Sequence, residues 1–251
     1  MSYQVFSRFY DKVMDQSVYE DWLSFVEQNR QNNHSQKSTL KILELACGTG
    51  KIAVDLAKAG HDVTGFDLSD EMLSLAYERM EEENVRLFLL EGDMREMGII
   101  GSFDTVTCFS DSLCYLTEEE DLLRVFQGVY NNLNKKGTFI FDVHSLYQMN
   151  EVFPGYQYIY QDENDVFLWE SFEGEKENSV EHMLTFFVSQ KDGLFERIHE
   201  FHEERTYSIP VLKRLLRTAG FQDIEVQADF GRNSIKEDTP RWFFTCRKAG
   251  R

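Results

Sequence analysis

Residues 41–50 read KILELACGTG, a short apolar run that ends in a glycine-containing turn. The next residues, 51–60, carry apolar side chains at helical spacing and end with Gly60 in a C-cap position. Gly48 and Gly50 allow the backbone to turn sharply and to approach a ligand where a side chain would collide. The stretch therefore predicts a strand, a tight turn and a helix.

Strands and helices alternate on the C-terminal side of this turn. Further strands are expected at 62–67, 85–93, 103–110 and 135–145, and helices at 69–83, where Ser69 can cap the N-terminus, and at 118–134. This alternation indicates a parallel sheet with helices on both faces. A helix at 209–221, with Pro210 near its start and Gly220 at its end, precedes closing strands at 222–228 and 241–247. The predicted fold is α/β, a Rossmann-like, doubly wound, mostly parallel sheet of seven strands.

Two segments depart from the alternation. Residues 17–29 form an amphipathic stretch with Trp22 on its apolar side. Residues 151–207 contain four strand-like runs joined by charged or glycine-containing turns, which predicts an inserted antiparallel β subdomain. We therefore expect one domain made of 1–150 and 208–251, with an N-terminal helical cover. For the 151–207 insertion, a lid and a homodimer surface remain open as roles.

Composition and residue spacing argue against several classes of protein. The formal net charge is −18 with no compensating basic stripe, which disfavours DNA or RNA as a partner. There is no run of 18 apolar residues and no signal-peptide core at the N-terminus, so a cytoplasmic protein is expected, neither exported nor spanning a membrane. The four cysteines form no CxxC pair. His199 and His202 are three residues apart and fall on opposite faces of a strand, so no metal site is expected.

Acidic residues lie within or just after four successive strands. They are Glu44, Asp67, Asp93 and Asp111. Strand ends of a parallel sheet border its ligand site, and a carboxylate at the end of the second strand can accept both hydroxyls of a ribose. The commoner alternative for Asp67 or Asp93 alone is a helix cap or turn residue. For a carboxylate inside an apolar strand, such as Glu44, burial is costly unless a cation or hydrogen-bond donor meets it.

The turn leaves two cofactor classes open. Its GTGKIA run also fits the dinucleotide fingerprint G-x-G-x-x-A, which would indicate an NAD-dependent oxidoreductase. NAD brings an anionic pyrophosphate, whereas S-adenosylmethionine brings an ammonium and a sulfonium against one carboxylate. At about 4 Å in a partly shielded site each charge pair is worth on the order of a few kcal/mol. Clustered acids therefore favour the sulfonium cofactor.

ELACGTG, GFDLS, EGDM and CFSDSLCYL resemble the successive motifs of class I S-adenosylmethionine-dependent methyltransferases, in order and spacing, over residues 40–145. The resemblance implies that Ala46 and Gly48 lie against the methionine part of the cofactor and that Glu44 orients the loop or receives the ammonium. It implies that Asp67 binds the ribose hydroxyls and that Asp93 accepts from the adenine amino group. The remaining implied contacts are Leu68 and Met72 beside the adenine, the Met94 backbone at a ring nitrogen, and Phe109 near the sulfonium.

The N-terminal segment resembles the part that many small methyltransferases fold over the cofactor. Tyr10 is the preferred contact there and Trp22 the second, with core packing as an equal alternative for Trp22. Asp111, Tyr115 and His144 are candidates for the acceptor side, because they follow strand ends. For His144, which shares a face with Asp142, a satisfied surface histidine is the commoner alternative.

Methyl transfer is an in-line displacement that needs positioning and exclusion of water more than a catalytic triad, so no catalytic residue is assigned. A small-molecule acceptor is expected, and the resemblance adds an acceptor pocket to the possible roles of the 151–207 insertion. The alternatives are the NAD-dependent oxidoreductase and a non-catalytic regulatory protein that keeps the cofactor pocket.

Overall fold

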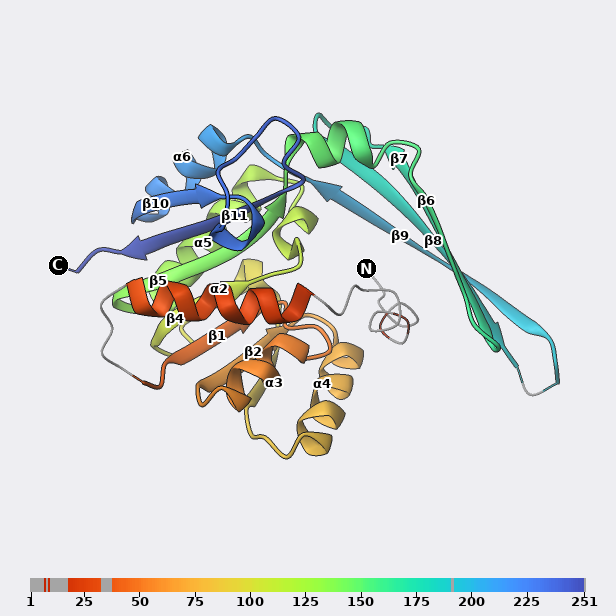
Figure 1. Ribbon diagram of the computed structural model, residues 1–251, viewed down its shortest axis with the longest axis horizontal. Coiled ribbons are helices and arrows are strands. Elements are labelled where there is room, and N and C mark those ends of the chain that lie inside the picture. Colours follow the sequence, from red (N-terminus) through yellow and green to blue (C-terminus); the bar gives the residue numbers. More distant parts are fainter. Residues whose placement is uncertain (1–6, 8, 10–17, 33–37, 191, 251) are drawn as a thin grey trace.

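The computed structural model describes residues 7, 9, 18–32, 38–190 and 192–250, and its centre is a seven-stranded sheet (Figure 1). In spatial order the strands are β10 (Phe221–Gln227), β11 (Arg241–Lys248), β5 (Leu133–His144), β4 (Phe103–Cys108), β1 (Lys41–Leu45), β2 (Asp62–Asp67) and β3 (Phe88–Glu91). The strands β1 to β5 pair in parallel, whereas β11 runs antiparallel to both β5 and β10. The predicted α/β class and mostly parallel sheet are confirmed.

Helices cover both faces of this sheet. The helices α5 (Glu119–Asn132) and α6 (Ile209–Ala219) pack on one face, and α2 (Tyr19–Asn32) and α3 (Lys51–Lys58) on the other, with α4 (Asp70–Glu82) beside α3. The alternation of side chains along β5 divides the core accordingly: Phe139 and Phe141 face α5, while Ile140 faces α2. Both faces are buried, which explains why the central strands are apolar on both sides.

The order of strands reverses between β1 and β4. Their carboxyl ends, Leu45 and Cys108, are paired neighbours in the sheet. Where the connections after two adjacent strands run to opposite faces of the sheet, a crevice opens at this edge, and ligands of such sheets bind there. The fold therefore places the loops after β1, β2, β3 and β4 around one position.

A second, four-stranded antiparallel sheet extends away from that edge (Figure 1). It consists of β6 (Gln157–Gln161), β7 (Asp165–Glu173), β8 (Ser179–Ser189) and β9 (Phe195–Arg205), in that order. The antiparallel insertion expected from the sequence is present. On β9, His202 is buried and His199 is exposed, as their spacing predicts for opposite faces.

Several local expectations can be compared with the structure. Ser69 is the N-cap of α4, and its hydroxyl accepts a hydrogen bond from the Met72 N–H at 3.2 Å. Gly60, with a φ of 95°, follows the C-cap of α3, which is Ala59, so the predicted C-cap position was wrong by one residue. The third strand was predicted too long, since β3 covers only Phe88–Glu91. Among the described residues, no helix has the length and apolarity needed to cross a membrane.

Candidate functional site

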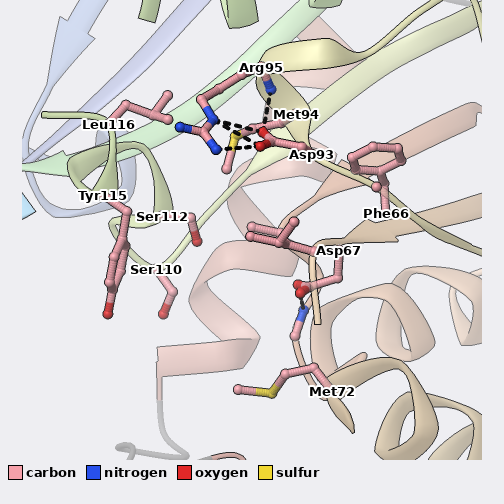
Figure 2. Close-up of a pocket in the computed structure, with 14 residues that line it drawn as sticks. Phe66, Asp67, Met72, Asp93, Met94, Arg95, Ser110, Ser112, Tyr115 and Leu116 are labelled. Atoms are coloured by element: carbon pink, nitrogen blue, oxygen red, sulfur yellow. Dashed lines mark hydrogen bonds and ion pairs between the residues drawn. The ribbon is translucent and has the colours of Figure 1, made fainter. Parts of the chain in front are cut away.

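A cavity of about 220 Å³ lies at the carboxyl ends of β1 to β4 (Figure 2). The loops that follow these four strands all contribute to its wall. The lining residues are Ala46, Gly48, Phe66, Asp67, Leu68, Met72, Gly92, Asp93, Met94, Arg95, Ser110, Ser112, Tyr115 and Leu116. The cavity therefore occupies the position that the reversal of strand order predicts.

The turn after β1 owes its shape to left-handed backbone conformations. Ala46, Gly48 and Gly50 have φ values of 52°, 54° and 72°. A Cβ atom at Gly50 would lie 2.7 Å from the Cβ of Ala76 in α4, so the close packing of α4 requires glycine there. A Cβ atom at Gly48 would have the Met72 Sδ as its nearest neighbour, 4.0 Å away, so the backbone there is open toward the cavity. The turn thus provides a backbone surface that a ligand can approach closely.

Asp67 ties the first two loops together. Its Oδ2 accepts the Gly48 N–H at 2.7 Å and its Oδ1 accepts the Ser69 N–H at 2.9 Å. Burial raises the pKa of Asp67, although these backbone donors oppose the shift. The carboxyl group lines the cavity, and its oxygens retain lone pairs for further donors. Because a carboxylate here takes the N–H of Gly48, the turn is ill suited to an anionic pyrophosphate.

Glu44 is buried inside β1 on the face that carries α3. Its exposed fraction is 2%, and its Oε2 has no hydrogen-bond partner among the described residues. Burial, followed by repulsion from Asp67 and Asp55, raises the pKa of Glu44 well above its usual value. An orphaned carboxyl oxygen in this position fits a cationic or hydrogen-bond-donating ligand group.

The other two strand-end acids are paired with arginine. Asp93 accepts from the Arg95 side chain, which lowers the pKa of Asp93, and it also caps a short 3-10 helix by accepting the Arg95 N–H at 2.8 Å (Figure 2). Asp111 bonds to Arg241 at 2.8 Å and does not line the cavity. The expectation that four acids favour a cationic cofactor therefore holds only for Glu44 and Asp67, because the charges of Asp93 and Asp111 are already neutralised.

The remaining predicted cofactor contacts divide into two groups. Four of them line the cavity: Ala46, Leu68, Met72 and Met94. Phe109 and Trp22 instead pack against each other in the core under α2, with ring centroids 6.1 Å apart. The Trp22 ring thus packs in the core, which was the alternative to a cofactor contact, although its Nε1 has no partner among the described residues. Tyr10 lies outside the described residues.

The three acceptor-side candidates lie close together. Tyr115 lines the cavity, and its hydroxyl is 3.1 Å from the Nδ1 of His202. The Nε2 of His144 is 3.1 Å from the Oδ2 of Asp111. The alternative of a satisfied surface histidine was wrong for His144: its side chain is only 12% exposed, and its Nδ1 has no partner in the described structure.

Sequence reasoning missed the residues that complete this side of the site. They come from the insertion and from the closing strand: His182 on β8, Glu204 on β9 and Arg241 on β11. His182 falls in a run of buried positions that otherwise holds Val180, Leu184 and Phe186. A polar residue at one position of an alternating apolar face was the available signal.

Comparison with known proteins gives a concordant result. A model of a methyltransferase domain matches residues 42–137. The chain is 40% identical over 248 residues to a protein named as a methyltransferase from Geobacillus sp. (strain WCH70), with 99% of this chain and 100% of that protein covered. A glycine/sarcosine N-methyltransferase from Aphanothece halophytica is 28% identical over 212 residues, which cover 83% of this chain and 76% of the relative.

A solved structure extends the likeness to the whole fold. The S-adenosylmethionine-dependent methyltransferase from Clostridium acetobutylicum ATCC 824 superposes with a TM-score of 0.85 at 27% identity, and the match covers 99% of both chains. None of these proteins is named as an NAD-dependent oxidoreductase, so that alternative has no support among them.

Proposed function

The chain belongs to the class I S-adenosylmethionine-dependent methyltransferases, and we propose that it methylates an amino nitrogen of a small molecule. The observation that carries the cofactor half of this proposal is the pair of buried carboxyl groups Glu44 and Asp67 beside an open glycine turn. The nitrogen acceptor is suggested by the relative named for glycine and sarcosine.

We assign the cofactor contacts to the side chains that line the cavity. Asp67 would accept the ribose hydroxyls, and Leu68 and Met72 would cover the adenine. Gly48 and Ala46 would lie along the methionine part, with Glu44 behind them as the partner of the ammonium. Asp93 would receive the adenine amino group while it keeps its contact with Arg95.

S-adenosylmethionine supplies an activated methyl group, so the protein mainly has to position the nucleophile and exclude water. The wall formed by Ser110, Ser112 and Tyr115 lies across the cavity from Met72 (Figure 2) and would face the acceptor. Residues 151–207 would shape the acceptor side, as a subdomain distinct from 1–150 and 208–251. Buried free cysteines fit a reducing compartment, and we place the reaction in the cytoplasm.

Calorimetric binding of S-adenosylmethionine tests the cofactor half. Wild-type protein should bind it, and Asp67→Ala should bind at least about tenfold more weakly, because hydrogen bonds to a charged group are each worth about 1.5–3 kcal/mol. Asp62→Ala is the matched control, since Asp62 is exposed at the opposite end of the same strand. Protein that binds NAD but not S-adenosylmethionine would contradict the proposal.

Mass spectrometry with a labelled methyl group tests the acceptor half. Glycine, sarcosine, amino sugars and polyamines should include a substrate, whereas the corresponding alcohols should stay unmodified. Methylation of the alcohols alone would show oxygen rather than nitrogen as the acceptor atom. Tight cofactor binding without any methylated product would favour a regulatory protein instead.

A further inference from the structure

A buried polar cluster adjoins the cavity at the junction of the two sheets. Its members come from β5, β8, β9, β11 and the loop after β4: Asp111, Asp142, His144, His182, Glu204 and Arg241. Five of its buried atoms have no hydrogen-bond partner among the described residues: Asp111 Oδ1, Asp142 Oδ1, His144 Nδ1, His182 Nε2 and Glu204 Oε2. Buried polar atoms are normally paired, so this concentration of unpaired atoms indicates a place for a ligand.

Local hydrogen bonds fix the orientation of His182. The Trp169 Nε1–H can only donate, and it lies 3.1 Å from the His182 Nδ1, which must therefore accept. The ring proton is then on Nε2, which lies 3.8 Å from Glu204 Oε1. Burial lowers the pKa of His182 to about 3, so the ring is neutral at physiological pH. His182 thus directs an unpaired donor toward Glu204.

His144 lies on the other side of Glu204. Its Nε2 is 3.1 Å from the Asp111 Oδ2 and 3.8 Å from the Glu204 Oε2. Burial raises the pKa of Asp111, but Arg241 and His144 outweigh this effect and lower it. Asp111 is therefore ionised and accepts the Nε2 proton of His144. Both gaps at Glu204 are too long for a hydrogen bond.

The pKa of the Glu204 carboxyl group is raised into the range where small changes in its surroundings alter its charge. Burial, followed by repulsion from Asp111, raises its pKa to about 8, although His202, a hydrogen bond from Tyr115 and Arg241 oppose the shift. At neutral pH the raised pKa favours the protonated form of this carboxyl group. A cation placed beside it would restore the charged form.

The cluster is in contact with the cavity wall. Tyr115 lines the cavity and also bonds to the cluster, while Ser110 and Ser112 line the cavity on either side of Asp111. A group held at Glu204 would therefore approach the cavity from the acceptor side.

We propose that this cluster is the acceptor site, and that Glu204 binds the acceptor as an ammonium ion and takes up its proton before methyl transfer. The inference rests on the proposed function and adds to it the substrate class and a catalytic residue. When the ammonium binds, Glu204 gives its own proton to solvent and pairs with the cation as a carboxylate. One proton then moves from the ammonium to this carboxylate, which leaves a neutral amine and returns Glu204 to its protonated form. The nitrogen lone pair then forms a bond to the methyl carbon as the carbon–sulfur bond breaks, and the sulfur keeps the bonding electrons. The methylated ammonium leaves, or it loses one proton to solvent.

Other titratable and charged groups face Glu204 and will influence its titration. They are Asp111, Cys114, Tyr115, His144, His182, His202 and Arg241. Glu203 is the matched control, because it is the adjacent carboxylate on the opposite face of β9 and its side chain is 44% exposed.

Calorimetry on protein saturated with S-adenosylhomocysteine tests the proposal. The probes are amines paired with alcohols or acids of similar shape: glycine and glycolate, glucosamine and glucose, putrescine and butanediol. Titrations at pH 7 in two buffers of different ionisation enthalpy report the protons exchanged on binding. For wild type and Glu203→Gln we expect amine binding with release of close to one proton, because Glu204 ionises. For Glu204→Gln we expect no proton release and at least about tenfold weaker amine binding, with unchanged affinity for S-adenosylhomocysteine.

Several outcomes would overturn the assignment. They are equal amine affinity and proton release in Glu204→Gln, equal binding of the neutral partners, or no amine binding to the loaded wild-type protein. Loss of S-adenosylhomocysteine binding in Glu204→Gln alone would show a structural role and would also overturn it. Failure of the wild-type protein to bind S-adenosylhomocysteine would refute the proposed function itself, which is a distinguishable result.

Discussion

The strand-end cavity and the polar cluster adjoin each other but are built in different ways. The cavity is shaped by the backbone: three left-handed residues follow β1, and two N–H groups hold Asp67. The cluster is shaped by side chains that come from five separate segments and leave buried atoms unpaired. A site that is formed by backbone conformation tolerates few substitutions in its own segment. A site that is formed by side chains from separate segments can change its chemistry through single substitutions.

This difference matches the proposed division of the reaction, with the cofactor in the cavity and the acceptor at the cluster. The cofactor is the same throughout the family, and a fixed backbone suits it. The acceptor differs among relatives, and the cluster draws His182 and Glu204 from the inserted sheet. Mutations should therefore act differently in the two regions, and the following predictions are ordered by the size of the expected effect.

Arg241→Met should have the largest effect on stability. The guanidinium is paired with two buried carboxylates, Asp111 and Asp142. Removal of one partner from a buried ion pair typically costs about 3–5 kcal/mol. Urea denaturation measures the loss, with Arg247→Met at the other end of β11 as the control. Equal stabilities of the two variants would show that the charges of the cluster are not coupled.

Gly50→Ala should destabilise the protein through the backbone. A left-handed alanine costs about 1–2 kcal/mol, and the overlap with Ala76 adds about 1–3 kcal/mol. Gly60→Ala is the matched control, because Gly60 is also left-handed, with a φ of 95°, but a Cβ atom there meets nothing within 4 Å. The difference between the two unfolding free energies isolates the packing of α4. If the two variants lose the same amount, the close approach of the turn to α4 is unimportant.

Glu204→Gln should flatten the pH dependence of stability. The native pKa of Glu204, about 8, exceeds the ordinary value of 4.5. As pH rises between these values, the unfolded chain releases a proton that the native protein keeps, and stability falls by up to about 1.4 kcal/mol per pH unit. The contribution of Glu204 to the free energy of unfolding is therefore complete below pH 4.5 and is lost as the pH rises through 8.

The pH dependence of stability that His182 contributes has the opposite sign to that of Glu204. Its pKa is lowered from 6.5 to about 3, so its contribution is present above pH 6.5 and is lost on acidification. The difference between wild type and Glu204→Gln therefore isolates Glu204. Denaturation series from pH 5 to pH 8 should show the variant gaining stability relative to wild type, while Glu203→Gln runs parallel to wild type. Parallel curves for all three proteins would refute the raised pKa of Glu204.

Arg95→Met should have the smallest effect. Arg95 lines the cavity and pairs with Asp93, and its side chain is 46% exposed. Exposed ion pairs are worth about 0.2–1 kcal/mol, so S-adenosylmethionine affinity should change less than about fivefold. Calorimetry at low and high salt measures this. A loss as large as that of Asp67→Ala would make Arg95 a direct part of the cofactor site.

The fold and the position of the cavity follow from local sequence signals. The apolar strands, the glycine turn and Ser69 each act over a few residues, and the parallel order follows from their alternation. The limits of β3 did not follow, because the apolar run VRLFLL begins at residue 85, whereas pairing with β2 begins only at Phe88. The pairing of Asp93 with Arg95, two residues away, is also a local signal, but the strand-end interpretation did not take it into account.

The cluster could not be predicted in the same way. Arg241 meets Asp111 across 130 positions of sequence, and this contact depends on β11 lying beside β5. The surroundings of the half-buried His144 likewise include Glu204, which the insertion brings to within 3.8 Å of it. Long-range contacts of this kind arise from the assembled sheet and leave no local periodicity.

The position of β11 has a consequence for biosynthesis. This strand follows every other strand of the central sheet in chain order, yet it lies between β10 and β5 in the interior. While the chain is being synthesised, the edge of β5 therefore stays unpaired, and Asp142 stays without its arginine, until Arg241–Lys248 has emerged. The ribosome thus releases the cofactor turn long before the acceptor cluster can form, and a nascent chain halted before β11 would expose a strand edge open to chaperones and to aggregation.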